Sequence, residues 1–195
     1  MGVRVGVVAA AVVLAVAGCS GGDAPDSALP SGSAPPQSSS PPSNPPSTAA
    51  TTPRPTAPPL PATATQDTPA GAQSFARYWL SVLDYATTTG DTRRLLALGA
   101  CVSCIALAKS IDALYASGGR AQGGRITVID SSVVRHVPGR AALVRVDYDQ
   151  MRGREIRGSG VPKSIPAQKG LGFAFALSRR GGSWTVAKLQ TVETS

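Results

Sequence analysis

The sequence predicts an α+β domain in which three N-terminal helices pack on one face of a mostly antiparallel, four-stranded sheet. Two observations indicate this class. Apolar residues recur every three or four positions from about residue 69 to residue 116, which is the helical period. After Gly123-Gly124 they alternate instead, which is the strand period. Helices followed by strands that short turns connect are typical of an α+β layout.

The first helix is predicted to begin at Thr68-Pro69, because Thr is a good N-cap and proline suits the first helical position. Thr87-Thr88-Thr89-Gly90 should end it. Its buried face carries an aromatic and aliphatic stripe: Phe75, Tyr78, Trp79, Val82, Leu83 and Ala86.

Two shorter helices should follow. Asp91 can cap the first of them, over Thr92 to Leu98, which buries three leucines. The other should run from about Ser103 to Ala116 and end at Gly118-Gly119.

Four strands are then expected. The first places Ile126, Val128 and Asp130 on one face, and Pro138-Gly139 turns the chain into the second. The others alternate in the same way. Their inward residues are Ala142, Val144, Val146 and Tyr148 in the second, Phe173, Phe175 and Leu177 in the third, and Trp184 and Val186 in the last.

The N-terminus has the layout of a secretory signal. Arg4 precedes an apolar run from Val5 to Ala17, and this run is shorter than the roughly 20 residues that span a bilayer. Residues 16–19, Val-Ala-Gly-Cys, resemble the lipobox of bacterial lipoproteins. That resemblance implies a signal peptide over residues 1–18, cleavage after Gly18, and acylation of Cys19. An uncleaved anchor and an ordinary secretory signal are the alternatives.

Residues 19–69 are predicted to be a disordered tether. Fourteen of the seventeen prolines lie between Ala24 and Pro69, among Ser, Thr and Ala. Such a stretch has too little apolar surface to fold, and its prolines favour an extended conformation. The α+β domain is therefore expected to cover residues 70–195.

That domain is basic. Seventeen Lys and Arg between Arg77 and Lys188 stand against eight Asp and Glu, which gives +9. A basic domain can bind nucleic acid, anionic lipid or acidic wall polymers. Export argues against nucleic acid, so anionic cell-envelope polymer or another envelope protein are the partners that we expect, with the membrane itself reached through the lipid anchor.

A set of features beyond this layout resembles a known family. The set comprises an aromatic-rich helical hairpin with Thr89-Gly90-Asp91, then Cys101-Val102-Ser103-Cys104, the paired glycines and the Trp184 strand. It resembles an uncharacterised family of actinobacterial lipoproteins, domain of unknown function 6318, whose layout is similar to the nuclear-transport-factor-2-like and SnoaL-like cone. The resemblance covers nearly all of residues 70–193. It implies a curved sheet folded against helices and an apolar pocket between them. Cone domains often form homodimers through the open sheet face, which the sequence does not decide.

Cys101 and Cys104 are predicted to form a disulfide that staples the corner between the second and third helices. With Cys19 lipidated, an even pair remains in an oxidising compartment. A redox-active pair is the alternative, because the motif begins a helix. Zinc and other metals are not expected, since too few Cys and His ligands exist. We expect no cofactor.

The sequence offers weak support for catalysis. His136 is the only histidine and should lie in an exposed turn. Asp147 and Asp149 share a face with Arg145, opposite the apolar residues, so they should face solvent. Asp130 is the better inward carboxylate, although a one-residue bulge would reverse that expectation.

The sequence therefore favours a non-catalytic binding module of unknown ligand. Its pocket, if open, would be lined by Trp79, Tyr148, Phe173 and Phe175; the alternative is that these four side chains fill the core. A small hydrolase or isomerase in the same pocket is a second hypothesis. A third is that the long basic stretch 152–170, predicted to be irregular with a short edge strand near Arg154 to Arg157, binds anionic envelope polymer.

Overall fold

A computed structural model describes residues 55–158 and 160–193. These residues belong to the second of two compact units, which covers residues 50–195. The predicted signal peptide, Cys19 and most of the predicted tether lie outside the described residues. Within the described part, no helix is long and apolar enough to cross a membrane.

The helices form where the apolar period predicts them. After the 3-10 turn η1 (Ala62–Thr65) come α1 (Pro69–Thr89), α2 (Arg93–Ala97) and α3 (Val102–Ala116). Thr68 caps α1 by accepting a hydrogen bond from the Gly71 amide at 3.0 Å. Gly90 ends α1 in the left-handed region, with φ at 77°, a conformation that costs glycine little.

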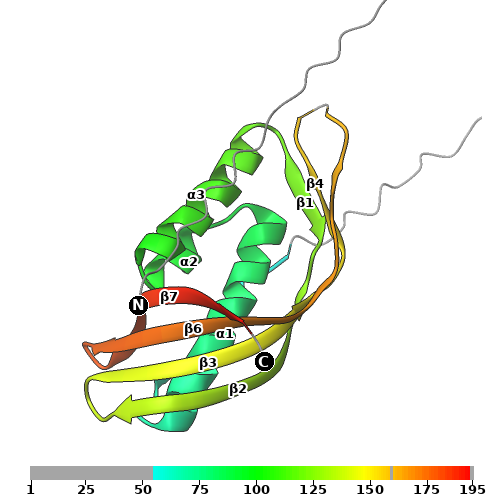
Figure 1. The fold of residues 1–195 in the computed structure, drawn as a ribbon. Coiled ribbons are helices and arrows are strands. Elements are labelled where there is room, and N and C mark those ends of the chain that lie inside the picture. The colour runs from blue at the N-terminus through cyan, green and yellow to red at the C-terminus, as the bar shows by residue number, and fades with distance from the viewer. Residues whose placement is uncertain (1–54, 159, 194–195) are drawn as a thin grey trace, which may run out of the picture. The chain divides into compact units, whose positions relative to one another are not determined.

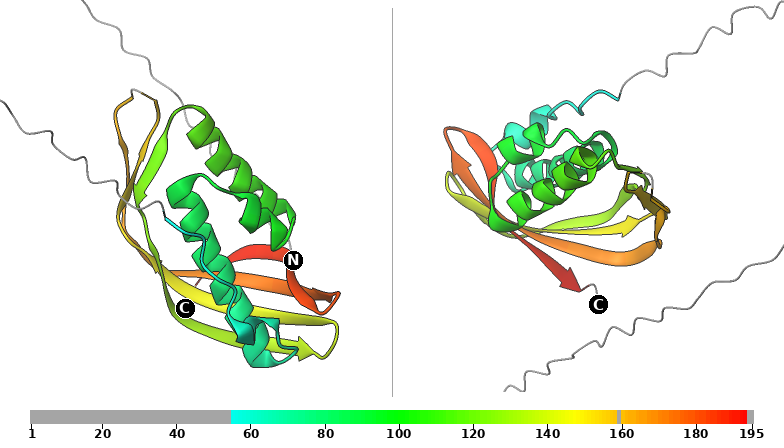
Figure 2. Two further views of the ribbon diagram at one scale, coloured as in Figure 1. Left: turned by 180° about the vertical axis from the view of Figure 1, so that it is seen from behind. Right: turned by 90° about the horizontal axis from the view of Figure 1, so that it is seen from above.

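A four-stranded antiparallel sheet follows, in the order β2-β3-β6-β7. Its strands are β2 (Ile126–Val137), β3 (Ala141–Gln150), β6 (Gln168–Arg180) and β7 (Ser183–Glu193). The helices cover one face of this sheet (Figure 1, Figure 2). The predicted α+β class with a four-stranded antiparallel sheet is confirmed at this level.

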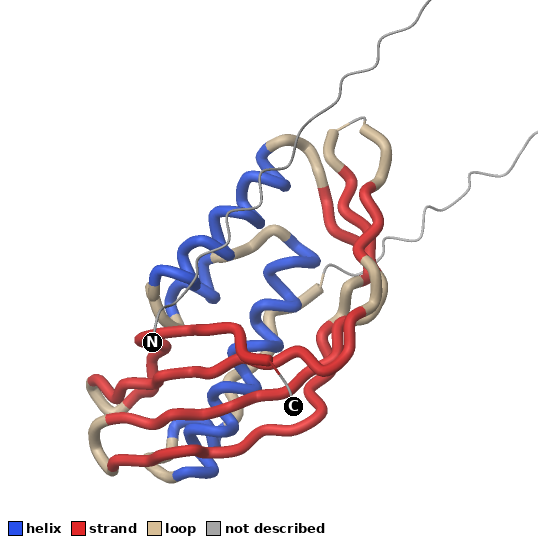
Figure 3. Tube along the Cα trace, viewed as in Figure 1, coloured by secondary structure: helices blue, strands red, loops and turns tan. Residues whose placement is uncertain are grey.

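A second sheet was not predicted. It has three antiparallel strands in the order β1-β4-β5: β1 (Arg120–Gly123), β4 (Gly153–Ile156) and β5 (Lys163–Ile165). The stretch 152–170, predicted to be mostly irregular, is therefore largely a β-hairpin paired to β1, and Figure 3 shows it extending beyond the larger sheet. The short runs of alternation were too weak to reveal it, although the expected edge strand near 154–157 corresponds to β4.

A β-bulge in β2 changes which residues face the helices. Val128 pairs with Tyr148, but Asp130 pairs with Asp147, so Ile129 is an extra residue on the β2 side. The extra residue shifts the alternation by one, as expected of a bulge. Asp130 is consequently exposed and Ser131 is buried, so the prediction that Asp130 faces inward is wrong.

Ser131 gains partners from α1 when it turns inward. Gln73 donates to both the carbonyl and the hydroxyl of Ser131, and Arg77 Nε donates to the same hydroxyl at 2.6 Å. A buried hydroxyl without such bonds would destabilise the fold. These bonds fix β2 against α1 in the bulged register.

The folded part begins earlier than residue 70. We call residues 58–67 the strap, because they run along the domain. Tyr78 and Arg94 donate to the carbonyl of Pro58, at 3.4 and 2.7 Å, and Ala64 is buried. The last tether residues therefore pack against the domain, which proline content alone did not indicate.

Candidate functional site

The four side chains predicted to line a pocket come together in the core. Trp79 and Phe175 are fully buried, and Tyr148 and Phe173 are each 8% exposed. Trp79 meets both phenylalanines edge to face, with ring centroids 6.4 Å from Phe173 and 5.4 Å from Phe175. Tyr148 stacks on Phe173 at 5.0 Å. Contacts of this kind indicate that the four rings form a packed cluster in the core. Of the four, Phe173 also lines a surface hollow between α3 and β7.

Burial raises the pKa of the Tyr148 hydroxyl above its ordinary value, because the charged phenolate is poorly solvated there. In the unfolded chain the same group ionises near pH 10. The contribution of this pKa shift to stability is therefore fully present below about pH 10. It is lost as the pH rises through the pKa of Tyr148 in the folded chain.

We expect the wild-type chain to lose stability above about pH 10 more steeply than a Tyr148→Phe variant. Denaturant midpoints measured at neutral and alkaline pH would show the difference. Equal alkaline losses for wild type and Tyr148→Phe would contradict the expectation.

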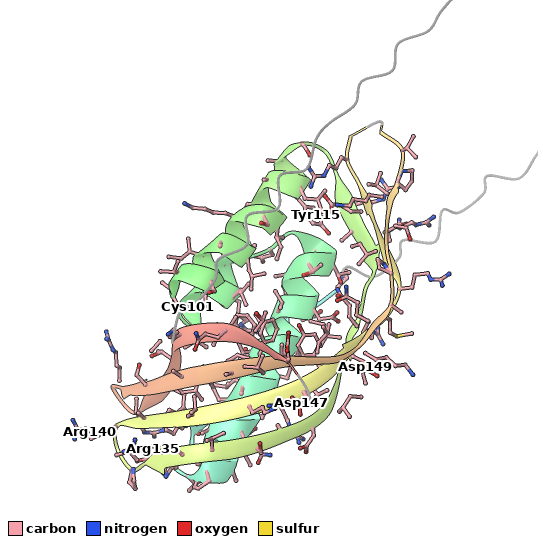
Figure 4. All side chains as sticks on the ribbon, viewed as in Figure 1. Cys101, Tyr115, Arg135, Arg140, Asp147 and Asp149 are labelled. Atoms are coloured by element: carbon pink, nitrogen blue, oxygen red, sulfur yellow. A yellow bond between two sulfur atoms is a disulfide. The ribbon has the colours of Figure 1, made fainter. Side chains whose placement is uncertain are left out.

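The three carboxylates considered for acid–base chemistry lie away from the aromatic cluster. Asp130 is exposed after the bulge. Asp147 accepts a hydrogen bond from Arg145 Nε at 2.9 Å, and Asp149 accepts one from the Gly170 amide at 3.0 Å (Figure 4). Among the described residues, no group of three or more His, Cys, Asp or Glu could hold a metal ion.

His136 was predicted to lie in an exposed turn, and this prediction is wrong. The residue lies in β2, and the strap covers its side chain. The side chain of His136 is only 12% exposed, and its Nε2 lies 3.3 Å from the Asp67 carboxylate. Asp67 also accepts from the Gly139 amide at 2.5 Å. Two side chains from the sheet complete the contact with the strap: Trp184 donates to the Gln66 carbonyl at 2.9 Å, and Arg179 donates to the Thr65 carbonyl at 3.0 Å.

Sequence reasoning missed this cluster because its members are far apart in the chain. Arg179 stacks over the Trp184 ring at 5.1 Å, and His136 approaches the same ring at 6.0 Å. The one available signal was Asp67, an acidic residue just before the helix N-cap at the end of a tether with few charges. The cluster holds the strap in place, so its role is structural.

Cys101 and Cys104 form a disulfide, with their Cα atoms 4.9 Å apart. Cys101 is also the N-cap of α3, and its Sγ accepts a hydrogen bond from the Cys104 amide at 3.1 Å. Both residues are buried in the hydrophobic core. This burial fits the structural interpretation, in which the pair fixes the turn from α2 into α3.

The stretch over residues 152–170, which contains the β4–β5 hairpin, is strongly basic. Residues 152–170 hold five cations and one carboxylate, a net charge of +4. Arg152, Arg154, Arg157, Lys163 and Lys169 are all exposed. Arg157 pairs with Glu155, and Arg154 Nε donates to the Gln122 side chain at 2.7 Å. This stretch thus presents exposed cations on and beside paired strands and can bind an extended anion.

Comparison with known proteins identifies a family model. Residues 41–190 match the model described as "Family of unknown function (DUF6318)". The chain has no match among curated protein sequences.

Two solved structures show a limited likeness. The intermembrane space region of chloroplast protein ARC6 is 9% identical, with a TM-score of 0.49, and the match covers 66% of this chain and 99% of that one. An NTF2-like protein with a cystatin-like fold from Novosphingobium aromaticivorans is 20% identical, with a TM-score of 0.35, and the match covers 60% of this chain and 79% of that one. Both likenesses are too weak to support a conclusion about the fold or the function of this chain.

Proposed function

The chain belongs to the DUF6318 family of unknown function, and we propose that it is a lipid-anchored, non-catalytic binding domain whose basic β4–β5 hairpin binds an anionic polymer of the cell envelope. The observation that carries this proposal is the exposed basic stretch over residues 152–170, which has a net charge of +4 and contains the paired β4–β5 hairpin. From the order of its helices and strands, we further propose that the domain has the nuclear-transport-factor-2-like cone fold.

The hairpin suits a repeating anion better than a small ligand. The five cations of residues 152–170 are spread over β4, β5, the start of β6 and the segments beside them, and all five are exposed. Exposed charges each contribute little to affinity, so binding needs several of them at once. A polymer with many anionic groups supplies this multiplicity, whereas a single small anion does not.

The proposed localisation at the membrane surface rests on the sequence of residues 16–19 and on the tether. Cys19, if acylated, would hold the chain at the outer face of the cytoplasmic membrane, and the proline-rich segment would extend the domain into the envelope. Export of this kind makes anionic envelope polymers, and not nucleic acids, the polyanions that the hairpin would meet.

A hydrolase or isomerase in the cone pocket is less well supported. Such a site needs an inward carboxylate near an open pocket. The bulge at Ile129 turns Asp130 outward, and the aromatic cluster is packed. These two observations favour the non-catalytic proposal.

The proposal predicts salt-sensitive binding. The full chain should be retained on immobilised anionic wall polymer at about 0.1 M salt, and released as the salt approaches about 1 M, where the screening length falls from about 10 Å to about 3 Å. A neutral polysaccharide matrix is the control. Retention that is unchanged in high salt, or equal on the neutral matrix, would rule out the electrostatic mode.

A further inference from the structure

The outward side of α3 repeats with a seven-residue period. Its sequence contains Ser-x-x-Ala-Leu twice, at residues 103–107 and 110–114, and Ser117, directly after the helix, keeps the same spacing. These positions lie on one side of a helix. The opposite side is buried in the domain through Cys104, Ala108 and Ile111.

This repeated side borders two adjoining hollows of about 580 Å³ each, which share Ser110. The first lies between α3 and β7 and has an apolar floor that includes Leu107, Phe173 and Leu189. Ser103 joins its walls by donating to the Leu189 carbonyl at 3.0 Å. We call the two hollows together the α3 groove.

The second hollow lies at the other end of α3, beside the basic hairpin. It is lined by Leu114 and Ser117 from the helix and by Arg157 from the hairpin. From Ser103 to Ser117 the groove follows about 21 Å of helix, at about 1.5 Å per residue. Figure 1 shows α3 running from beside β7 toward the hairpin. One end of the groove is thus apolar and the other end is cationic.

We propose that the α3 groove binds a long-chain fatty acid, with the acyl chain over Phe173 and Leu189 and the carboxylate at Arg157. Charge complementarity carries the choice of occupant. Arg157 uses Nε in its contact with Glu155, while its side chain is 72% exposed, so its terminal amines can bind a carboxylate.

Two negative charges oppose an anion at this end of the groove: the Glu155 carboxylate, which Arg157 contacts, and the negative end of the α3 dipole. The carbonyls of Ala113, Leu114 and Tyr115 there already accept hydrogen bonds from residues 117–119, which reduces the effect of the dipole. Three exposed cations on the hairpin, Arg154, Arg157 and Lys163, outnumber Glu155 and set the preference for an anionic head group.

A second copy of α3 is a poorer occupant. The charged residues of α3 are Lys109 and Asp112. Asp112 already accepts a hydrogen bond from Thr92 at 2.8 Å, and Lys109 would add positive charge beside a basic hairpin. The fatty acid instead places an anion where the cations lie.

The test uses the full chain with Cys19→Ser, so that no acyl group of its own competes, and anthroyloxy-palmitic acid as the fluorescent probe. The methyl ester of this probe is the matched neutral ligand. We expect saturable binding of the acid, at least tenfold weaker binding of the ester, and at least tenfold weaker binding of the acid to an Arg157→Ala variant. Arg152→Ala, directly before β4 and outside the groove lining, should bind as the parent does.

Two variants should block the groove from opposite walls, so that a folding defect in one leaves the other as a test. Ala106→Trp fills it from α3 and Gln190→Trp fills it from β7. Each should reduce probe binding at least tenfold, whereas Ala116→Trp, on the same helix outside the groove lining, should not.

Four results would overturn the proposal: no saturable binding, equal binding of acid and ester, binding unaffected by both blocking variants, or binding unaffected by Arg157→Ala. A dimer in sedimentation that Ala106→Trp abolishes would also overturn it and assign the groove to a second copy. Polymer retention is measured separately and does not depend on these outcomes.

Discussion

Replacing Trp79 with alanine should lower the free energy of unfolding by about 3–5 kcal/mol, the usual cost of removing a large aromatic side chain from a packed core. Trp79 is fully buried and its ring touches both Phe173 and Phe175. Its removal would leave a cavity that neighbouring rings fill only in part. Urea unfolding followed by circular dichroism measures the change.

The size of this effect distinguishes a filled core from an open pocket. If Trp79 lined an open pocket, its truncation would remove fewer contacts and cost about 1 kcal/mol or less. Val161→Ala, at a side chain that is 93% exposed, is the control and should change stability by less than about 0.5 kcal/mol.

A chain that begins at Thr68 should be less stable than one that begins at Pro55 by at least about 3 kcal/mol. Both chains keep the Thr68 cap of α1, but the shorter one lacks the strap. The loss leaves the indole N–H of Trp184 without the Gln66 carbonyl, and the guanidinium of Arg179, which is 14% exposed, without Thr65 and Asp67. Buried polar groups that lose their partners are costly.

Thermal and urea unfolding of the two chains measure this difference. A Trp184→Phe variant of the longer chain removes a single hydrogen bond of the strap and should cost about 1 kcal/mol. Equal stability of the two chains would show that the strap is only loosely associated and that the domain begins near residue 70, as its sequence suggested.

The helices were predictable because each satisfies a strong local pattern. The period of Phe75, Tyr78, Trp79 and Val82, together with the Thr68 cap, gave α1 nearly to the residue. Alternation likewise gave β3 and its inward residues. Such patterns depend on neighbours in the chain and therefore appear in a single sequence.

The remaining features depend on contacts between distant residues. The bulge at Ile129 adds one residue that alternation cannot reveal, and it moves Asp130 to solvent. The hairpin needs β1 as a partner, and the strap needs Trp184 and Arg179, which lie more than a hundred residues further along the chain. The aromatic cluster was predicted as a set, with an open pocket and a filled core as the two alternatives.

A matched pair of charge reversals tests the central claim, which is that the basic hairpin is the binding surface. Arg154→Glu with Lys163→Glu reverses two hairpin charges, and Arg135→Glu with Arg140→Glu reverses two at the opposite end of the larger sheet (Figure 4). Both pairs change the net charge by the same amount. The measurement is retention of the full chain on anionic wall polymer at about 0.1 M salt. The proposal predicts that the hairpin pair abolishes retention while the other pair leaves most of it. Equal loss in both would contradict the claim and would mean that net charge alone holds the chain to the polymer.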